Sequence, residues 1–217
     1  MENERRIDRT TSMGMDEHRL SDILHASQIK ATDIYETPPQ IIWIDNSTIA
    51  TLGNFSASTG KAKSKKTFNV SALVAASLAG KQVLNYRAHL PEGKQRILYV
   101  DTEQSRFHCR SVLERILRLA GLPTTTDPEN LDFFCLREYS PSVRIEVIDY
   151  ALRQQKGYGL VIIDGIRDLM LDINNAGESV EVINRMMEWS SRYDLHIHCV
   201  LPVSYTHLRA HETEADL

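Results

Sequence analysis

Short apolar runs alternate along this chain with longer segments in which apolar residues recur every three or four positions. The short runs are typical of buried strands, and the periodic segments are typical of amphipathic helices. Apolar strands separated by helices indicate a parallel sheet that is covered on both faces. We therefore predict an α/β fold of three layers with a mostly parallel sheet. Its strands are expected at 55–59, 96–101, 131–135, 160–164 and 196–201, and its helices at 68–80, 107–120, 142–155 and 178–193.

The pattern divides the chain into three parts. Residues 1–38 are polar and weakly periodic, with one short helix expected at 22–27, and form an N-terminal extension. Residues 39–201 carry the alternating pattern and open with a predicted β-hairpin, Ile41–Ile44 and Thr48–Leu52 around a polar turn.

Residues 202–217 have no apolar face and resemble translated adaptor or vector sequence. We expect this third part to be a disordered or non-native tail on a domain that is truncated at its C-terminus. Termini without packing contacts are commonly disordered.

Composition sets limits on location and partners. The chain has 217 residues, of which 42% are hydrophobic and 25% are charged, and its net charge of −4 gives no global basic field for nucleic acid. The three cysteines have no metal-type spacing, which favours reduced thiols. No apolar run approaches the ~18 residues of a membrane span, and the N-terminus lacks a secretory signal. We expect a cytoplasmic protein without a membrane partner.

A phosphate-binding loop is the main chemical signal. The usual pattern is Gly, four variable residues, Gly, Lys, then Ser or Thr. Gly60, Lys66 and Thr67 fit this spacing, whereas Lys65 stands where the second Gly is expected. A buried strand before the loop and a helix after it form the context that the motif requires. The expected nucleotide contacts are Gly60, Lys61, Ala62, Lys63, Ser64, Lys65, Lys66, Thr67 and Phe68.

Two acids follow predicted strands at the rim where ligands of parallel sheets gather. Asp164 ends the most apolar strand and is a candidate ligand of Mg²⁺, together with the Thr67 hydroxyl. Glu103 is the candidate base that activates water, with Asp101 as the alternative. Either acid is also suited to a simpler role, which is to cap the helix that begins near Phe107.

The loop, the Asp-Thr-Glu-Gln-Ser segment at 101–105 and the strand that ends in Asp164-Gly165 together resemble the RecA-like ATPases, over about residues 40–201. The similarity is to the branch of AAA-type ATPases that includes the RepA hexameric helicase and related proteins of bacterial plasmids and mobilizable elements.

The resemblance implies a P-loop NTPase core that binds ATP and Mg²⁺, with Lys66 and Glu103 as catalytic residues and with Thr67 and Asp164 at the metal. It also implies a homo-oligomer that acts on DNA in replication or mobilization. The family's polar sensor residue would fall within 202–217. The Lys65 substitution and this missing segment favour an alternative, a nucleotide-binding interaction module with little turnover.

Overall fold

The computed structural model describes residues 17–61, 64–172 and 176–202, and the chain divides into two units, one up to Thr37 and one from Pro38. The first unit contains helix α1 (Glu17–Ser27), which is longer than the predicted 22–27. None of the α1 residues is buried, and its apolar side chains Leu20, Ile23 and Leu24 are exposed.

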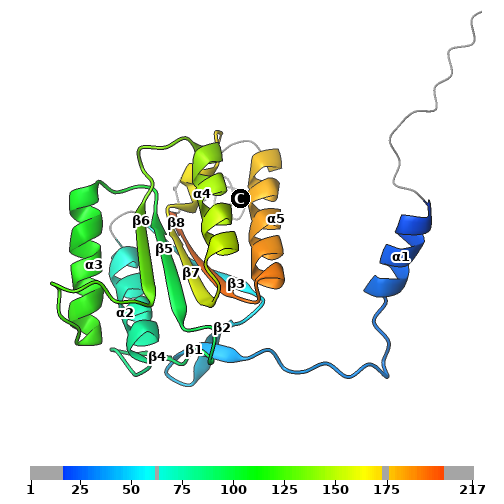
Figure 1. Cartoon of the computed structure of the whole chain (residues 1–217), viewed down its shortest axis with the longest axis horizontal. Coiled ribbons are helices and arrows are strands. Elements are labelled where there is room, and N and C mark those ends of the chain that lie inside the picture. The colour runs from blue at the N-terminus through cyan, green and yellow to red at the C-terminus, as the bar shows by residue number, and fades with distance from the viewer. Residues whose placement is uncertain (1–16, 62–63, 173–175, 203–217) are drawn as a thin grey trace, which may run out of the picture. The chain divides into compact units, whose positions relative to one another are not determined.

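The second unit is built on a five-stranded parallel sheet, as predicted (Figure 1). In spatial order the strands are β3 (Phe55–Gly60), β8 (His196–Pro202), β7 (Tyr158–Asp164), β5 (Arg96–Asp101) and β6 (Leu131–Cys135). The register places Asp101 level with Asp164 on neighbouring strands. The carboxyl ends of β5 and β7 therefore lie side by side at the rim of the sheet, where its strands end.

Two pairs of helices cover the two faces of this sheet, which confirms the three-layer α/β fold (Figure 1). On one face lie α2 (Lys66–Ala79) and α3 (Arg106–Ala120), and on the other lie α4 (Pro141–Gln154) and α5 (Ala176–Arg192). Fully buried strand residues alternate between the two cores, so that Ile97 and Tyr99 pack under α2 and α3 while Leu98 packs under α4.

A second, antiparallel sheet contains the predicted hairpin. Strands β1 (Gln40–Ile44) and β2 (Ser47–Thr51) pair as expected, and β1 also pairs with β4 (Tyr86–Ala88), which the sequence pattern did not predict. The order is β2-β1-β4, so the hairpin is separate from the main sheet. Ile41 and Ile42 are fully buried and join the core that includes α2.

One prediction about burial was wrong. The strand before the phosphate loop was expected to be buried, but in β3 every second residue, Phe55, Ala57 and Thr59, is exposed. The reason is its place in the sheet: among the described strands, β3 pairs only with β8 and forms an edge. The alternation is that of a half-covered strand.

Candidate nucleotide-binding site

The phosphate loop joins the end of β3 to the start of α2. Lys65, at the N-cap of α2, has φ 61° and ψ 26°, which is the left-handed region. A glycine adopts this conformation without steric cost, and this explains why the usual motif has Gly here. The chain thus keeps the backbone shape of the motif with a lysine in place of glycine. Of the predicted loop residues, Ala62 and Lys63 lie outside the described residues.

The Lys66 side chain folds over this loop. Its Nζ donates hydrogen bonds to the carbonyl oxygens of Gly60 and Lys61, both at 2.8 Å. The loop is tight, because a Cβ atom added at Gly60 would lie 2.8 Å from Ser64 Oγ. The ammonium group is therefore held at the N-terminus of α2, where the helix dipole also favours an anion.

Asp164 lies at the end of β7 with only 3% of its surface exposed. Its Oδ2 accepts a hydrogen bond from the Tyr99 hydroxyl at 2.9 Å, and the Thr67 side chain and Lys66 lie near enough to favour its charged form. Burial raises the pKa of Asp164, the Tyr99 hydrogen bond opposes this shift, and the neighbouring Asp101 charge adds to it. A hydroxyl and a carboxylate near each other at a strand end are oxygen ligands of the kind that Mg²⁺ prefers.

The structure separates the roles of the two acids that follow β5. Asp101 is fully buried, and its Oδ1 accepts hydrogen bonds from the backbone N–H groups of Glu103 (3.0 Å) and Gln104 (2.8 Å). Its Oδ2 accepts a further bond from Gln104 Nε2 at 2.8 Å. Asp101 therefore holds the loop that carries Glu103. Neither acid caps the following helix, whose N-cap residue is Ser105.

Glu103 is exposed at the rim. Partial burial raises its pKa, and the nearby carboxylates of Asp164, Asp168 and Asp101 raise it further, whereas Lys66 lowers it. These interactions show that Glu103 lies within electrostatic reach of both Asp164 and the phosphate-loop lysine. A glutamate with a raised pKa is a stronger base than an ordinary one.

A close backbone contact fixes Glu103 beside Asp164. The Thr102 N–H donates to the Asp164 carbonyl oxygen at 3.0 Å, and the Thr102 hydroxyl donates to the Gly165 carbonyl oxygen at 2.7 Å. Gly165 has φ 104°, and a Cβ atom there would overlap Thr102 Oγ1 and lie 2.6 Å from Glu103 Cγ. Only glycine fits at this point, so the Asp-Gly pair after β7 has a steric reason.

Behind the phosphate loop lies a buried polar network that sequence reasoning missed. His196 Nδ1 lies 2.9 Å from the Thr51 carbonyl oxygen, so this nitrogen carries the proton and donates. The Ser56 hydroxyl then donates to His196 Nε2 and accepts from His198 Nδ1, both at 2.8 Å. Ser58 completes the chain at His198 Nε2, 2.9 Å away. The network braces β3 against β8, and no sequence signal links residues that lie 140 positions apart.

The structure thus brings together most of the residues predicted for the site. Lys66, Thr67, Asp164 and Glu103 meet where β3, β7 and β5 end. Phe68 follows in the first turn of α2 and is 41% exposed. Sequence reasoning did not single out Tyr99, although a tyrosine within an otherwise apolar strand is a detectable signal for a buried polar contact.

The sequence profile of one family, described as an AAA domain, matches residues 20–202. This chain belongs to the AAA domain family. The match covers most of the described chain, and an AAA domain is a nucleotide-binding domain of the P-loop ATPase type. No curated protein matches this AAA domain. Among the described residues no helix is long and apolar enough to span a bilayer.

Proposed function

We propose that this AAA domain binds ATP and hydrolyses it with Mg²⁺. The observation that carries the proposal is the shared position of the phosphate-loop Lys66, the buried Asp164 and Glu103, which is held against Gly165 at the same rim. A lysine, a hydroxyl–carboxylate pair and a basic glutamate are the parts that phosphoryl transfer to water requires.

Each residue has a distinct role in this proposal. Lys66 exchanges its two carbonyl partners for oxygens of the outer phosphates, and the new hydrogen bonds are stronger because both donor and acceptor are charged. Thr67 and Asp164 would hold Mg²⁺, which, when bound, neutralises charge on the phosphates. Glu103 orients and deprotonates the attacking water, while Asp101 keeps the Glu103 loop in place.

The biological setting follows from the resemblance to the RepA-helicase branch. We propose a cytoplasmic homo-oligomer that couples ATP hydrolysis to work on DNA during replication or mobilization of a mobile element. Lys61, Lys65 and Lys66 cluster in one loop of a chain whose net charge is negative. This local positive charge is consistent with an anionic partner. This setting rests on family analogy alone.

A second candidate is an interaction module that binds nucleotide with little turnover. Lys65 favours it, because a non-glycine residue in the left-handed conformation places a side chain where the motif usually has none. Under this alternative, the parent binds ATP but hydrolyses it slowly, and replacing Glu103 changes the rate of hydrolysis little.

The test is ATP binding and phosphate release by the full chain with and without Mg²⁺, for the parent and for Lys66→Ala. We expect Lys66→Ala to weaken ATP binding at least tenfold, because the charge-assisted bonds to the outer phosphates are lost. The matched control is Lys81→Ala, which removes an exposed lysine just beyond the other end of α2.

Equal loss in both variants would show a general charge effect, and unchanged binding in Lys66→Ala would contradict the site assignment. Adding single-stranded DNA separates the two candidates. Stimulated phosphate release supports a DNA-linked ATPase, and tight binding without release supports the interaction module.

A further inference from the structure

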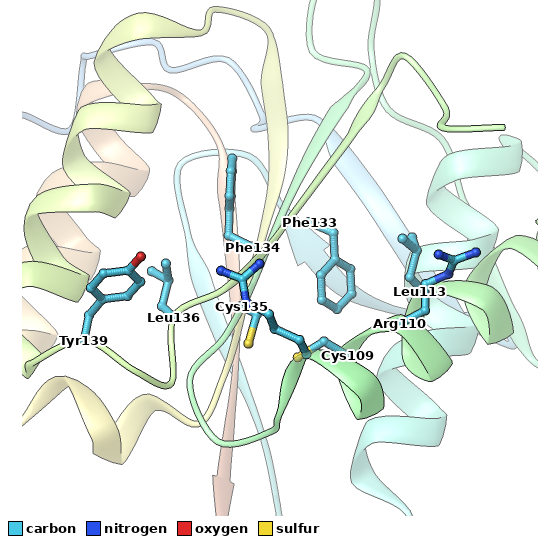
Figure 2. A pocket seen from close by; sticks show the side chains of 9 residues that line it. Cys109, Arg110, Leu113, Phe133, Phe134, Cys135, Leu136 and Tyr139 are labelled. Atoms are coloured by element: carbon cyan, nitrogen blue, oxygen red, sulfur yellow. The ribbon is translucent and has the colours of Figure 1, made fainter. Parts of the chain in front are cut away.

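Two of the cysteines, Cys109 and Cys135, lie together beside the loop that carries Glu103. Cys109 is in the first turn of α3, and Cys135 is the last residue of β6. Both thiols donate to the same acceptor, the carbonyl oxygen of Gln104, with sulfur–oxygen distances of 3.7 Å and 3.3 Å. Figure 2 shows the two sulfur atoms facing each other between β6 and α3. Both cysteines are free, so the site is a pair of neighbouring thiols.

The two thiols differ in their access to solvent. Cys109 is only 4% exposed, whereas Cys135 is half-buried. Both line a pocket of about 340 Å³ that also includes Arg106 and Arg110. Reactive cysteines sit in partly exposed, electropositive surroundings of this kind. A small oxidant that enters the pocket therefore meets Cys135 first.

Cys109 is suited to a second step. Burial raises the pKa of its thiol, and the neighbouring Asp101 carboxylate and Cys135 raise it further. Cys109 therefore keeps its proton at neutral pH and is protected from direct oxidation. A sulfenic acid condenses with a thiol beside it to form a disulfide. Oxidised Cys135 would be such a partner for Cys109.

We propose that hydrogen peroxide converts Cys135 and Cys109 into a reversible disulfide that loosens the loop carrying Glu103. In the first step a peroxide oxygen bonds to Cys135 Sγ, the O–O bond breaks and one water leaves, so that Cys135 becomes a sulfenic acid. In the second step the two Sγ atoms bond, and the hydroxyl leaves with the Cys109 proton as a second water. The sulfur atoms together give two electrons to the peroxide, and a dithiol reverses the change.

The disulfide acts on the loop through Gln104. Oxidation removes both S–H donors from the Gln104 carbonyl oxygen, and an S–S bond of about 2 Å draws the start of α3 toward the end of β6. Gln104 is also held by Asp101, through its backbone N–H and its side chain, both at 2.8 Å. The Glu103 N–H donates to the same carboxylate. A shift of Gln104 therefore weakens the hold of Asp101 on Glu103.

The effect on the loop and the effect on catalysis are separate. The disulfide and the loosened loop depend only on the two thiols and on Gln104. Slower phosphate release from the oxidised protein rests in addition on the proposed function, in which Glu103 is the base. Disulfides that form transiently act as redox sensors in reducing compartments.

The experiment treats the full chain with hydrogen peroxide, measures its intact mass and maps the linked peptides. We expect the parent to lose about 2 Da, the mass of two hydrogen atoms, through a link between Cys109 and Cys135 that dithiothreitol reverses. Cys199→Ser is the matched control and should form the same link, because Cys199 lies on β8 and its thiol donates to the Ser56 carbonyl oxygen.

The two serine variants of the pair identify the link. Cys135→Ser and Cys109→Ser should form no disulfide, although each keeps a hydroxyl donor for Gln104. Cys135 is the less buried of the two, so Cys135→Ser serves if Cys109→Ser fails to fold.

Hydrogen exchange then reports the state of the loop. The amides of Glu103 and Gln104 should exchange roughly tenfold faster in the oxidised parent than in the reduced parent, and peroxide should not change them in Cys135→Ser. The proposal is overturned if no link forms between Cys109 and Cys135, if peroxide only adds oxygen or joins two chains, or if exchange does not rise. A link with faster exchange but parental phosphate release would support the disulfide and contradict the role of Glu103.

Discussion

At the scale of single residues, Lys65 determines how the phosphate loop is shaped. Its left-handed backbone conformation is the one that glycine supplies in the usual motif. For a non-glycine residue this conformation costs roughly 1–2 kcal/mol. The sequence shows the substitution but not the torsion angle, so the strain became evident only in the structure. Compared with the glycine of the usual motif, Lys65 is strained in this conformation but adds a positive charge next to the expected phosphates.

Replacing Lys65 with Gly should therefore stabilise the fold by about 1 kcal/mol while it removes that charge. We expect ATP affinity to change less than tenfold, because the two effects oppose each other. Urea unfolding and ATP titration of Lys65→Gly and Lys65→Ala measure them separately, since only the glycine variant relieves the strain. A much larger gain in affinity would favour the interaction module.

The histidine network predicts how stability depends on pH. Burial lowers the pKa of His196 and His198 to about 4, below the 6.5 of an unperturbed histidine. As pH falls below about 6.5, the unfolded chain therefore binds protons before the folded chain does. The contribution of these histidines to the free energy of unfolding is complete above that pH and decreases toward pH 4, by on the order of 3 kcal/mol for each group.

Urea unfolding between pH 7 and pH 4.5 tests this in the parent and in His198→Gln, which keeps a polar side chain but does not titrate. The variant should lose less stability over this range. The comparison also isolates the histidines from Asp164 and Asp101, whose raised pKa values act in the opposite direction. Parallel pH profiles for the two proteins would contradict the network as described.

At the scale of elements, the site depends on how two strand ends are joined. The turn after β7 and the loop after β5 contact each other at Gly165, where no side chain fits. Gly165→Ala should displace Glu103 and lower phosphate release at least tenfold. Gly53→Ala is the control, because Gly53 also has a positive φ, 73°, but a Cβ atom there would meet nothing within 4 Å.

Both variants place a side chain at a positive φ, which should cost about 1 kcal/mol of stability in each, and Gly165→Ala should lose more because its Cβ also overlaps Thr102. Only Gly165→Ala should add a loss of activity. If the two variants release phosphate equally fast, the contact at Gly165 does not position Glu103.

Elements with strong local patterns were predictable. The strand at 131–135 matches β6, and the helix predicted at 142–155 differs from α4 by one residue at each end. Strand β4 was missed because it is three residues long and its pairing partner β1 lies about forty residues earlier. The exposure of β3 was missed because the order of strands in a sheet is a tertiary property that a local apolar pattern does not report.

At the scale of the whole molecule, the parallel sheet gathers residues from distant parts of the sequence into one site. Strand spacing and the phosphate-loop motif predicted that Lys66, Thr67, Asp164 and Glu103 would share one rim, and the structure places them within interaction range. The supporting contacts of Tyr99 and Gly165 were not predictable, because they depend on packing between strands that are far apart in the chain.

The most direct test of the account is phosphate release from ATP and Mg²⁺ by the full chain, measured with nucleotide binding for Glu103→Gln and for Glu138→Gln, which changes another exposed glutamate. We predict that Glu103→Gln binds ATP like the parent but releases phosphate at least a hundredfold more slowly, whereas Glu138→Gln behaves like the parent. Parental release rates in Glu103→Gln would contradict the central claim that this rim is an ATPase site with Glu103 as its base.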